Sequence, residues 1–128
     1  MIGVFSTLIL SLLFLSVPLE LEGQQMKEVK TVTLKSPGEI KYASAVYEAI
    51  DAMSNRVRGC MEDKNLLPNQ CICLHKESLE NVKAAYVNAV KKFPTWKDKL
   101  VYYKKADDPA GYNVVFDGLD KQLEVNCE

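Results

Sequence analysis

Apolar side chains recur at intervals of three and four residues in the middle of the chain, and this spacing predicts one face of an amphipathic helix. The first such run is Ile40, Ala43, Val46, Tyr47, Ile50, Met53, Val57 and Cys60. Ser36 precedes Pro37, and Glu39 lies three positions after the serine, so we expect a capping box with Ser36 as the N-cap. This helix is expected to end near Asp63.

A second run with the same spacing is Leu79, Val82, Tyr86, Ala89, Val90 and Phe93. The second helix should stop at Phe93, because Pro94 disfavours helical geometry in the residue before it. Asn65, Pro68 and Asn69 predict a loop between the two helices. Two helices joined by a cross-linked loop predict an antiparallel helical hairpin.

The last third of the chain has a shorter pattern. Residues 100–103 and 112–116 are rich in β-branched and aromatic side chains and flank a turn signal at 107–111, which predicts a two-stranded β-hairpin. An isolated hairpin is only marginally stable, so it should pack on the helices. Asp117 is expected to cap a short final helix. The predicted fold class is mainly α, with α+β an equally fair label: a disulfide-stapled antiparallel helical hairpin with a small C-terminal β-hairpin and a short terminal helix.

The N-terminal residues differ from the rest in composition. Residues 1–17 carry no charged side chain, and Pro18 ends this apolar run, so residues 1–23 are predicted to be a cleaved secretory signal peptide. The alternative is an uncleaved membrane anchor of residues 2–17, because the run is close to the roughly 18-residue lower limit for a bilayer span. Either interpretation places the rest outside the cytoplasm, secreted, periplasmic or membrane-anchored. Residues 24–35 are expected to form an extended arm, and residues 36–128 a single small globular domain.

The four cysteines are Cys60, Cys71, Cys73 and Cys127. An even number in an oxidising compartment indicates two disulfides. A bridge between Cys71 and Cys73 would strain a very small ring, so in both remaining pairings one bridge joins Cys60 to this segment and the other joins it to Cys127. The alternative is a zinc or copper site of Cys60, Cys71, Cys73 and His75, because side chains two apart share a face if the segment is extended.

Charge is nearly balanced, with 16 basic and 17 acidic residues, which does not favour nucleic acid as a partner. Lysines and aromatic residues are interleaved in the second half of the chain, so a binding surface for a protein or an anionic surface is one interpretation. Its candidate residues are Trp96, Lys97, Lys99, Tyr102 and Tyr103. The other interpretation, which we favour, is that the aromatic residues form the core and the lysines cover the outside.

Little in the sequence supports catalysis. There is one histidine, no G-x-S-x-G motif and no glycine-rich phosphate loop. By elimination, we expect a non-catalytic exported binding or interaction domain with no cofactor. The alternatives are a metal-binding protein that uses thiolates and His75, and a small secreted enzyme, which would require a concave pocket containing perturbed titratable groups.

Overall fold

The first long helix, α2 (Pro37–Lys64), begins at the predicted capping box. The backbone N–H of Glu39 donates to Ser36 Oγ at 3.2 Å, which satisfies one of the donors that a helix leaves unpaired at its start. The Ser36 hydroxyl in turn donates to Glu39 Oε1 at 3.1 Å. At the other end, Asn65 has a φ of 55° and its N–H donates to the Met61 carbonyl, so a left-handed residue terminates the helix.

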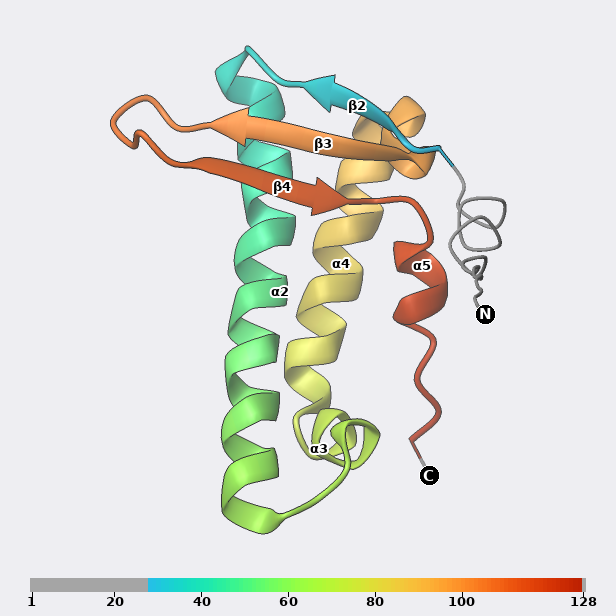
Figure 1. Cartoon of the computed structure of the whole chain (residues 1–128). Coiled ribbons are helices and arrows are strands. Elements are labelled where there is room, and N and C mark those ends of the chain that lie inside the picture. The colour runs from blue at the N-terminus through green and yellow to red at the C-terminus, as the bar shows by residue number, and fades with distance from the viewer. Residues whose placement is uncertain (1–27, 128) are drawn as a thin grey trace, which may run out of the picture.

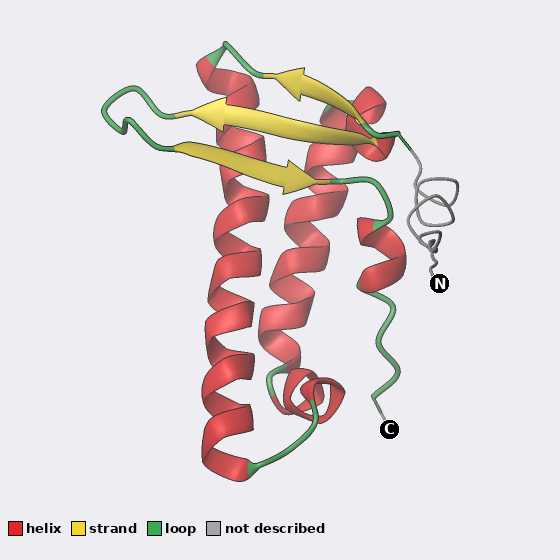
Figure 2. Cartoon of the chain, viewed as in Figure 1, coloured by secondary structure: helices red, strands yellow, loops and turns green. Residues whose placement is uncertain are grey.

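The computed structural model describes residues 28–127 (Figure 1). The predicted signal peptide, the alternative anchor and the beginning of the predicted arm lie outside the described residues. Within them, two long helices lie side by side and antiparallel, and a small sheet crosses one end of the pair on one face (Figure 2). The predicted fold class, a mainly helical chain with a small β part and two disulfides, is confirmed.

The segment after α2 differs from the prediction. Residues 68–74 form a short helix, α3 (Pro68–Leu74), whereas the sequence pattern predicted a loop and, for the metal site, an extended segment. Pro68 occupies the first turn, where its missing N–H costs nothing, and the Leu67 N–H donates to Gln70 Oε1 at 2.9 Å. The second long helix, α4 (Lys76–Lys92), then ends before Phe93 as predicted.

The sheet has three strands, one more than the predicted hairpin. β3 (Lys99–Lys104) and β4 (Gly111–Val115) are antiparallel, with Val101 opposite Val114. β2 (Lys30–Thr33), from the predicted arm, pairs in parallel with β3, so the order is β2-β3-β4. A Cβ atom at residue 111 would collide with the Tyr102 ring, so glycine allows this ring to lie across the neighbouring strand.

Two short elements close the core. η2 (Pro94–Asp98) is a 3₁₀ helix between α4 and β3, and it buries Trp96. α5 (Leu119–Gln122) follows β4 and is preceded by Gly118 with a φ of 78°, so the cap is this left-handed glycine and not Asp117 as predicted. The buried core residues are Leu34, Ala43, Val46, Leu79, Val82, Tyr86, Ala89, Trp96, Val101, Tyr103, Val114, Phe116, Leu119 and Leu123.

The helical hairpin has two differently built halves. We call residues 37–50 of α2, the facing part of α4 and the sheet the sheet-covered half. Residues 51–64 of α2, together with α3 and the beginning of α4, form the opposite end of the hairpin (Figure 1). We call this end the stapled half, because both disulfides involve its residues.

Candidate functional site

The apolar face of α2 is only partly covered in the stapled half. From residue 49 to residue 59 no residue of this helix is fully buried, although its apolar spacing continues without a break. Ile50, Met53 and Val57 are half-buried on this side. The sheet crosses α2 nearer its beginning, and α5 lies beside α4, where Leu123 approaches Tyr86 and Val87. An apolar surface is therefore left open along α2.

A groove follows this open surface. Its first part, about 470 Å³, lies between α2, β4 and α5. It is lined by Tyr47, Ile50, Asp51, Met53, Ser54, Asn113, Val114, Val115, Leu119, Gln122 and Leu123. Its second part, about 520 Å³, lies between α2 and α3. It is lined by Met53, Ser54, Val57, Arg58, Met61, Glu62 and Ile72. The two parts meet at Met53 and Ser54, and together we call them the α2 groove.

The buried disulfide positions one wall of the α2 groove. Cys60 lies in the last turns of α2 and Cys71 in the middle of α3, with 5.8 Å between their Cα atoms. Both side chains are buried, at 5% and 0% exposure. This bond holds α3 against the end of α2, so that Ile72, the next residue, reaches the groove.

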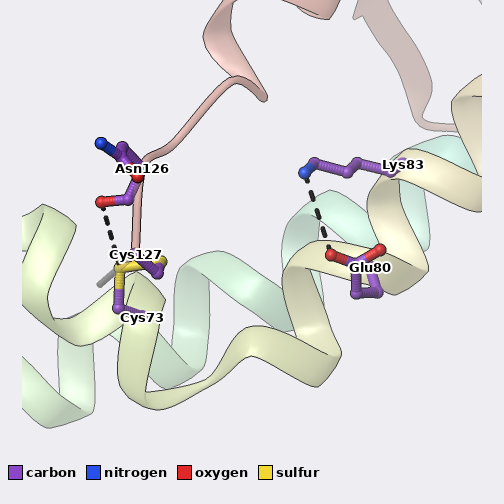
Figure 3. Close-up of a disulfide and its surroundings, with 5 residues drawn as sticks. All are labelled: Cys73, Glu80, Lys83, Asn126 and Cys127. Carbon is purple, nitrogen blue, oxygen red and sulfur yellow. Dashed lines mark hydrogen bonds and ion pairs between the residues drawn. A yellow bond between two sulfur atoms is a disulfide. The ribbon is translucent and has the colours of Figure 1, made fainter.

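The second disulfide, between Cys73 and Cys127, fixes the C-terminal segment to α3 (Figure 3). The carbonyl oxygen of Asn126 lies 4.0 Å from Cys73 Sγ. Because α3 is a helix, side chains two positions apart point in different directions, so Cys71 reaches α2 while Cys73 reaches the C-terminal segment. This selects one of the two pairings that the sequence left open.

Charged side chains accompany the apolar ones in the groove. Asp51 and Arg58 are both exposed and lie seven residues, or two helical turns, apart on α2. Arg58 Nη2 donates to Asn55 Oδ1 at 2.6 Å, which holds the guanidinium along the helix. Met53 and Met61 contribute flexible, polarisable side chains, which adapt well to the shape of a partner. With Glu62 beside Met61, the groove is therefore an apolar strip with two acidic positions and one basic position on α2.

The alternative metal site does not form. Cys60, Cys71 and Cys73 are all in disulfides, so none is available as a thiolate ligand. His75 lies between α3 and α4, where its carbonyl accepts the N–H groups of Ser78 and Leu79. Within residues 28–127, no group of three or more His, Cys, Asp and Glu side chains is arranged to hold a metal ion.

The aromatic residues considered for a binding surface are mostly in the core. Trp96 is 2% exposed and Tyr103 is 1% exposed, so neither reaches a partner. Tyr102 is half-buried on the outer face of the sheet, against Gly111. This result corrects the surface interpretation for Trp96 and Tyr103, and it follows from the 3₁₀ helix that turns Trp96 inward between Phe93 and Phe116.

Lys97 and Lys99, the remaining candidates, line a separate groove of about 680 Å³ between η2 and the start of α5. Its other charged residues are Asp98, Asp117, Asp120 and Lys121. Lys99 Nζ lies 2.6 Å from Asp98 Oδ1. Since three carboxylates face three ammonium groups, this region does not present the strongly basic surface that an anionic partner would favour.

Perturbed titratable groups are found in the core and at the hairpin turn. Burial, with a smaller effect of the Glu48 carboxylate, raises the pKa of Tyr103 to about 12. Burial also raises the pKa of Tyr86. The Asp108 carboxylate accepts a hydrogen bond from the Tyr112 hydroxyl, which lowers the pKa of Asp108 and raises that of Tyr112. None of these four residues lines the α2 groove.

Comparisons of the chain with protein-family models, with curated proteins and with solved structures found no match. The two disulfides indicate an oxidising environment of the extracellular type. Among the helices formed by residues 28–127, none has the length and apolar character needed to span a bilayer.

The sequence pattern contained part of the signal for the groove. Ile50, Met53 and Val57 were assigned to the apolar face of the first helix. Ile50 and Met53 pack against the core, and Val57 is half-buried and lines the groove. The sequence did not reveal that the sheet would cover only the beginning of that face. Local spacing defines a face, whereas the contacts that cover it come from residues 99–123.

Proposed function

We propose that this protein is an exported, non-catalytic interaction domain whose α2 groove binds an amphipathic helix of a protein partner. The observation that carries the proposal is the half-buried apolar strip of α2, which the sheet and α5 leave uncovered. Globular domains usually bury the apolar face of such a helix, so a strip left open along one face marks an interaction site.

The shape of the groove favours a helix over a small molecule. Pockets for small ligands enclose most of the ligand surface, whereas this groove is open along its length. It runs along α2 from Tyr47 to Met61, which corresponds to roughly 20 Å at the helical rise per residue. About four turns of a partner helix fit this length, with anchors at positions i, i+3, i+4 and i+7.

Export supports the same proposal. The predicted signal peptide of residues 1–23 directs the domain to a secreted or periplasmic location, and the alternative anchor also leaves the domain outside the cytoplasm. The two disulfides agree with these locations. Because they hold α3 and the C-terminal segment in place, the groove is formed before a partner arrives, which lowers the entropic cost of binding.

A titration with a synthetic amphipathic helical peptide tests this function. The probe has a leucine face over four turns, and its control has the same composition in scrambled order. We expect changes in the ¹⁵N–¹H spectrum of the oxidised protein confined to residues that line the α2 groove. Ser54 is exposed at the junction of the two parts of the groove, so Ser54→Arg should block binding without unfolding the domain.

The matched control is Ala52→Arg, an equally exposed position of α2 that does not line the groove. It should bind the peptide like the wild type, while Ser54→Arg should weaken binding roughly tenfold or more. Equal binding by the two variants, or equal binding of the scrambled peptide, would contradict the proposed function.

A further inference from the structure

The groove face of α2 has a heptad pattern. Tyr47, Ile50, Ser54, Val57 and Met61 alternate at three and four residue steps, and all five line the groove. This is the a/d spacing by which two helices pack side by side in a coiled coil. With Tyr47 at an a position, Asp51 and Arg58 both fall at e positions, which flank such a contact and set its orientation through their charges.

We propose that the helix bound in the α2 groove is α2 of a second copy of this chain, packed antiparallel in a symmetric dimer. The inference rests on the proposed function, because it names the partner of the same groove. With the two-fold axis close to Asn55, Ile50 packs against Met61 of the second copy and Ser54 against Val57 of the second copy. The small side chain of Ser54 allows the two helices to approach near the centre.

The charges distinguish this arrangement from its alternative. In the antiparallel dimer Asp51 lies opposite Arg58 of the second copy, and symmetry repeats this ion pair on the other side of the axis. In a parallel dimer an e position lies opposite a g position of the second copy, and the g positions here are Val46, Met53 and Cys60. Asp51 and Arg58 would then have no charged partner across the contact. The charges of α2 therefore pair across the contact only in the antiparallel orientation.

The shape of the molecule is consistent with the same orientation. In the part of the chain that the structure describes, the sheet crosses one end of the helical hairpin and does not extend over the other end (Figure 1). Antiparallel packing brings the sheet-covered half of each copy beside the stapled half of the other. The two sheets therefore do not meet, and the open apolar strips can approach each other.

Sedimentation equilibrium of the oxidised wild type and of two charge-reversal variants tests the proposed dimer. We expect the wild type to dimerise at micromolar concentration, and Asp51→Arg and Arg58→Asp each to weaken the dimer roughly tenfold or more, because each places two like-charged pairs in the contact. An equimolar mixture of the two variants should dimerise again. In the mixed dimer, the two positive positions of one chain face the two negative positions of the other.

Asp63→Arg is the matched control, because it makes the same charge change at an exposed position of α2 outside the groove. It should leave the dimer unchanged. A monomeric wild type at about 1 mM, or a mixture that fails to dimerise, would overturn the dimer. If the amphipathic peptide still binds and Ser54→Arg still blocks it, the proposed function stands and only the identity of the partner is wrong.

Discussion

The sheet-covered half and the stapled half share the same two helices but are held together by different interactions. In the sheet-covered half, aromatic side chains fill the space between the helices and the sheet. In the stapled half, where no strand among residues 28–127 lies on the helices, covalent bonds fix α3 and the C-terminal segment. The difference shows that a small domain can leave part of an apolar face open when disulfides replace some of the burial.

The aromatic contacts of the sheet-covered half form a continuous chain. Tyr42 meets Phe93 edge-on at 5.7 Å between ring centroids, and Phe93 stacks on Trp96 at 4.4 Å. Trp96 contacts Phe116 at 5.5 Å, and Phe116 stacks on Tyr86 at 5.9 Å. These rings link α2, α4, η2 and the segment after β4, so their removal should affect the whole domain.

The largest effect is expected from Phe116→Ala. Phe116 is 0% exposed and contacts two other rings, so its loss leaves a cavity that costs about 3–5 kcal/mol of unfolding free energy. Equilibrium unfolding in urea measures this cost. Val115→Ala, at the exposed neighbouring residue, should change the free energy by less than about 0.5 kcal/mol. A similar cost for both variants would show that aromatic packing does not dominate the sheet-covered half.

A smaller effect is expected when the C-terminal disulfide is removed by Cys73→Ala together with Cys127→Ala. We expect a loss of about 2–4 kcal/mol, because the unfolded chain gains the freedom that the bridge removed. The comparison is Cys60→Ala with Cys71→Ala. The bridge between Cys73 and Cys127 spans 54 residues, and the bridge between Cys60 and Cys71 spans 11. Loop-closure entropy alone therefore predicts the larger loss of unfolding free energy when the 54-residue bridge is removed.

Urea unfolding of both double variants sharpens the contrast between the halves. The bridge between Cys60 and Cys71 is buried, whereas the C-terminal bridge is only half-buried. A larger loss of unfolding free energy for the Cys60 and Cys71 double variant would therefore show that packing outweighs loop closure in the stapled half. A negligible loss for Cys73 and Cys127 would mean that noncovalent packing, such as that of Leu119, Leu123 and Val125, is enough to hold the C-terminal segment.

The smallest effect is a gain in stability. The Tyr103 hydroxyl is buried and has no hydrogen-bond partner among the described residues, so Tyr103→Phe should stabilise the domain by about 1 kcal/mol. Tyr102→Phe, on the outer face of the sheet, should be nearly neutral. Thermal or urea unfolding at neutral pH measures both. Destabilisation by Tyr103→Phe would show that the hydroxyl contributes an interaction that the fold needs.

The pH dependence gives the same substitution a second measurement. The pKa of Tyr103 in the folded state, about 12, is above the usual value of 10. Ionisation of this phenol is therefore less favourable in the folded state than in the unfolded state. Below pH 10 the phenol is neutral in both states, so this effect does not change the unfolding free energy of the wild type. As the pH rises from 10 to 12, the phenol ionises in the unfolded state first and the unfolding free energy of the wild type falls. The stability advantage of Tyr103→Phe over the wild type should therefore widen across this interval.

Sequence reasoning predicted the elements whose signals are local. Ser36, Pro37 and Glu39 specified the start of α2, and Pro94 specified the end of α4. A bridge between Cys71 and Cys73 was excluded because only one residue separates them, so the ring it would close is strained. It could not select the pairing, because that depends on whether residues 68–74 are helical, and a single proline followed by Gln70 is a weak indication of a helix.

What the sequence could not supply depends on distant residues. β2 is a strand only because β3 lies beside it, and its four residues alternate too weakly to be recognised. The sequence left Trp96 as a candidate surface residue beside the favoured core interpretation, and only the contacts with Phe93 and Phe116 show that it is enclosed. The groove required knowledge of where the sheet stops along α2, which no local pattern contains.

The parallel pairing of β2 with β3 has a consequence for the order of folding. All of α2, α3 and α4 lie between these strands in the sequence, so their contact closes the longest loop of the sheet and forms only at a high entropic cost. We expect the helical hairpin and the β3–β4 hairpin to assemble first and β2 to join last. Pulsed hydrogen exchange during refolding should therefore protect the amides of residues 30–33 later than those of α4, and β2 is expected to be the last part of the sheet to become native.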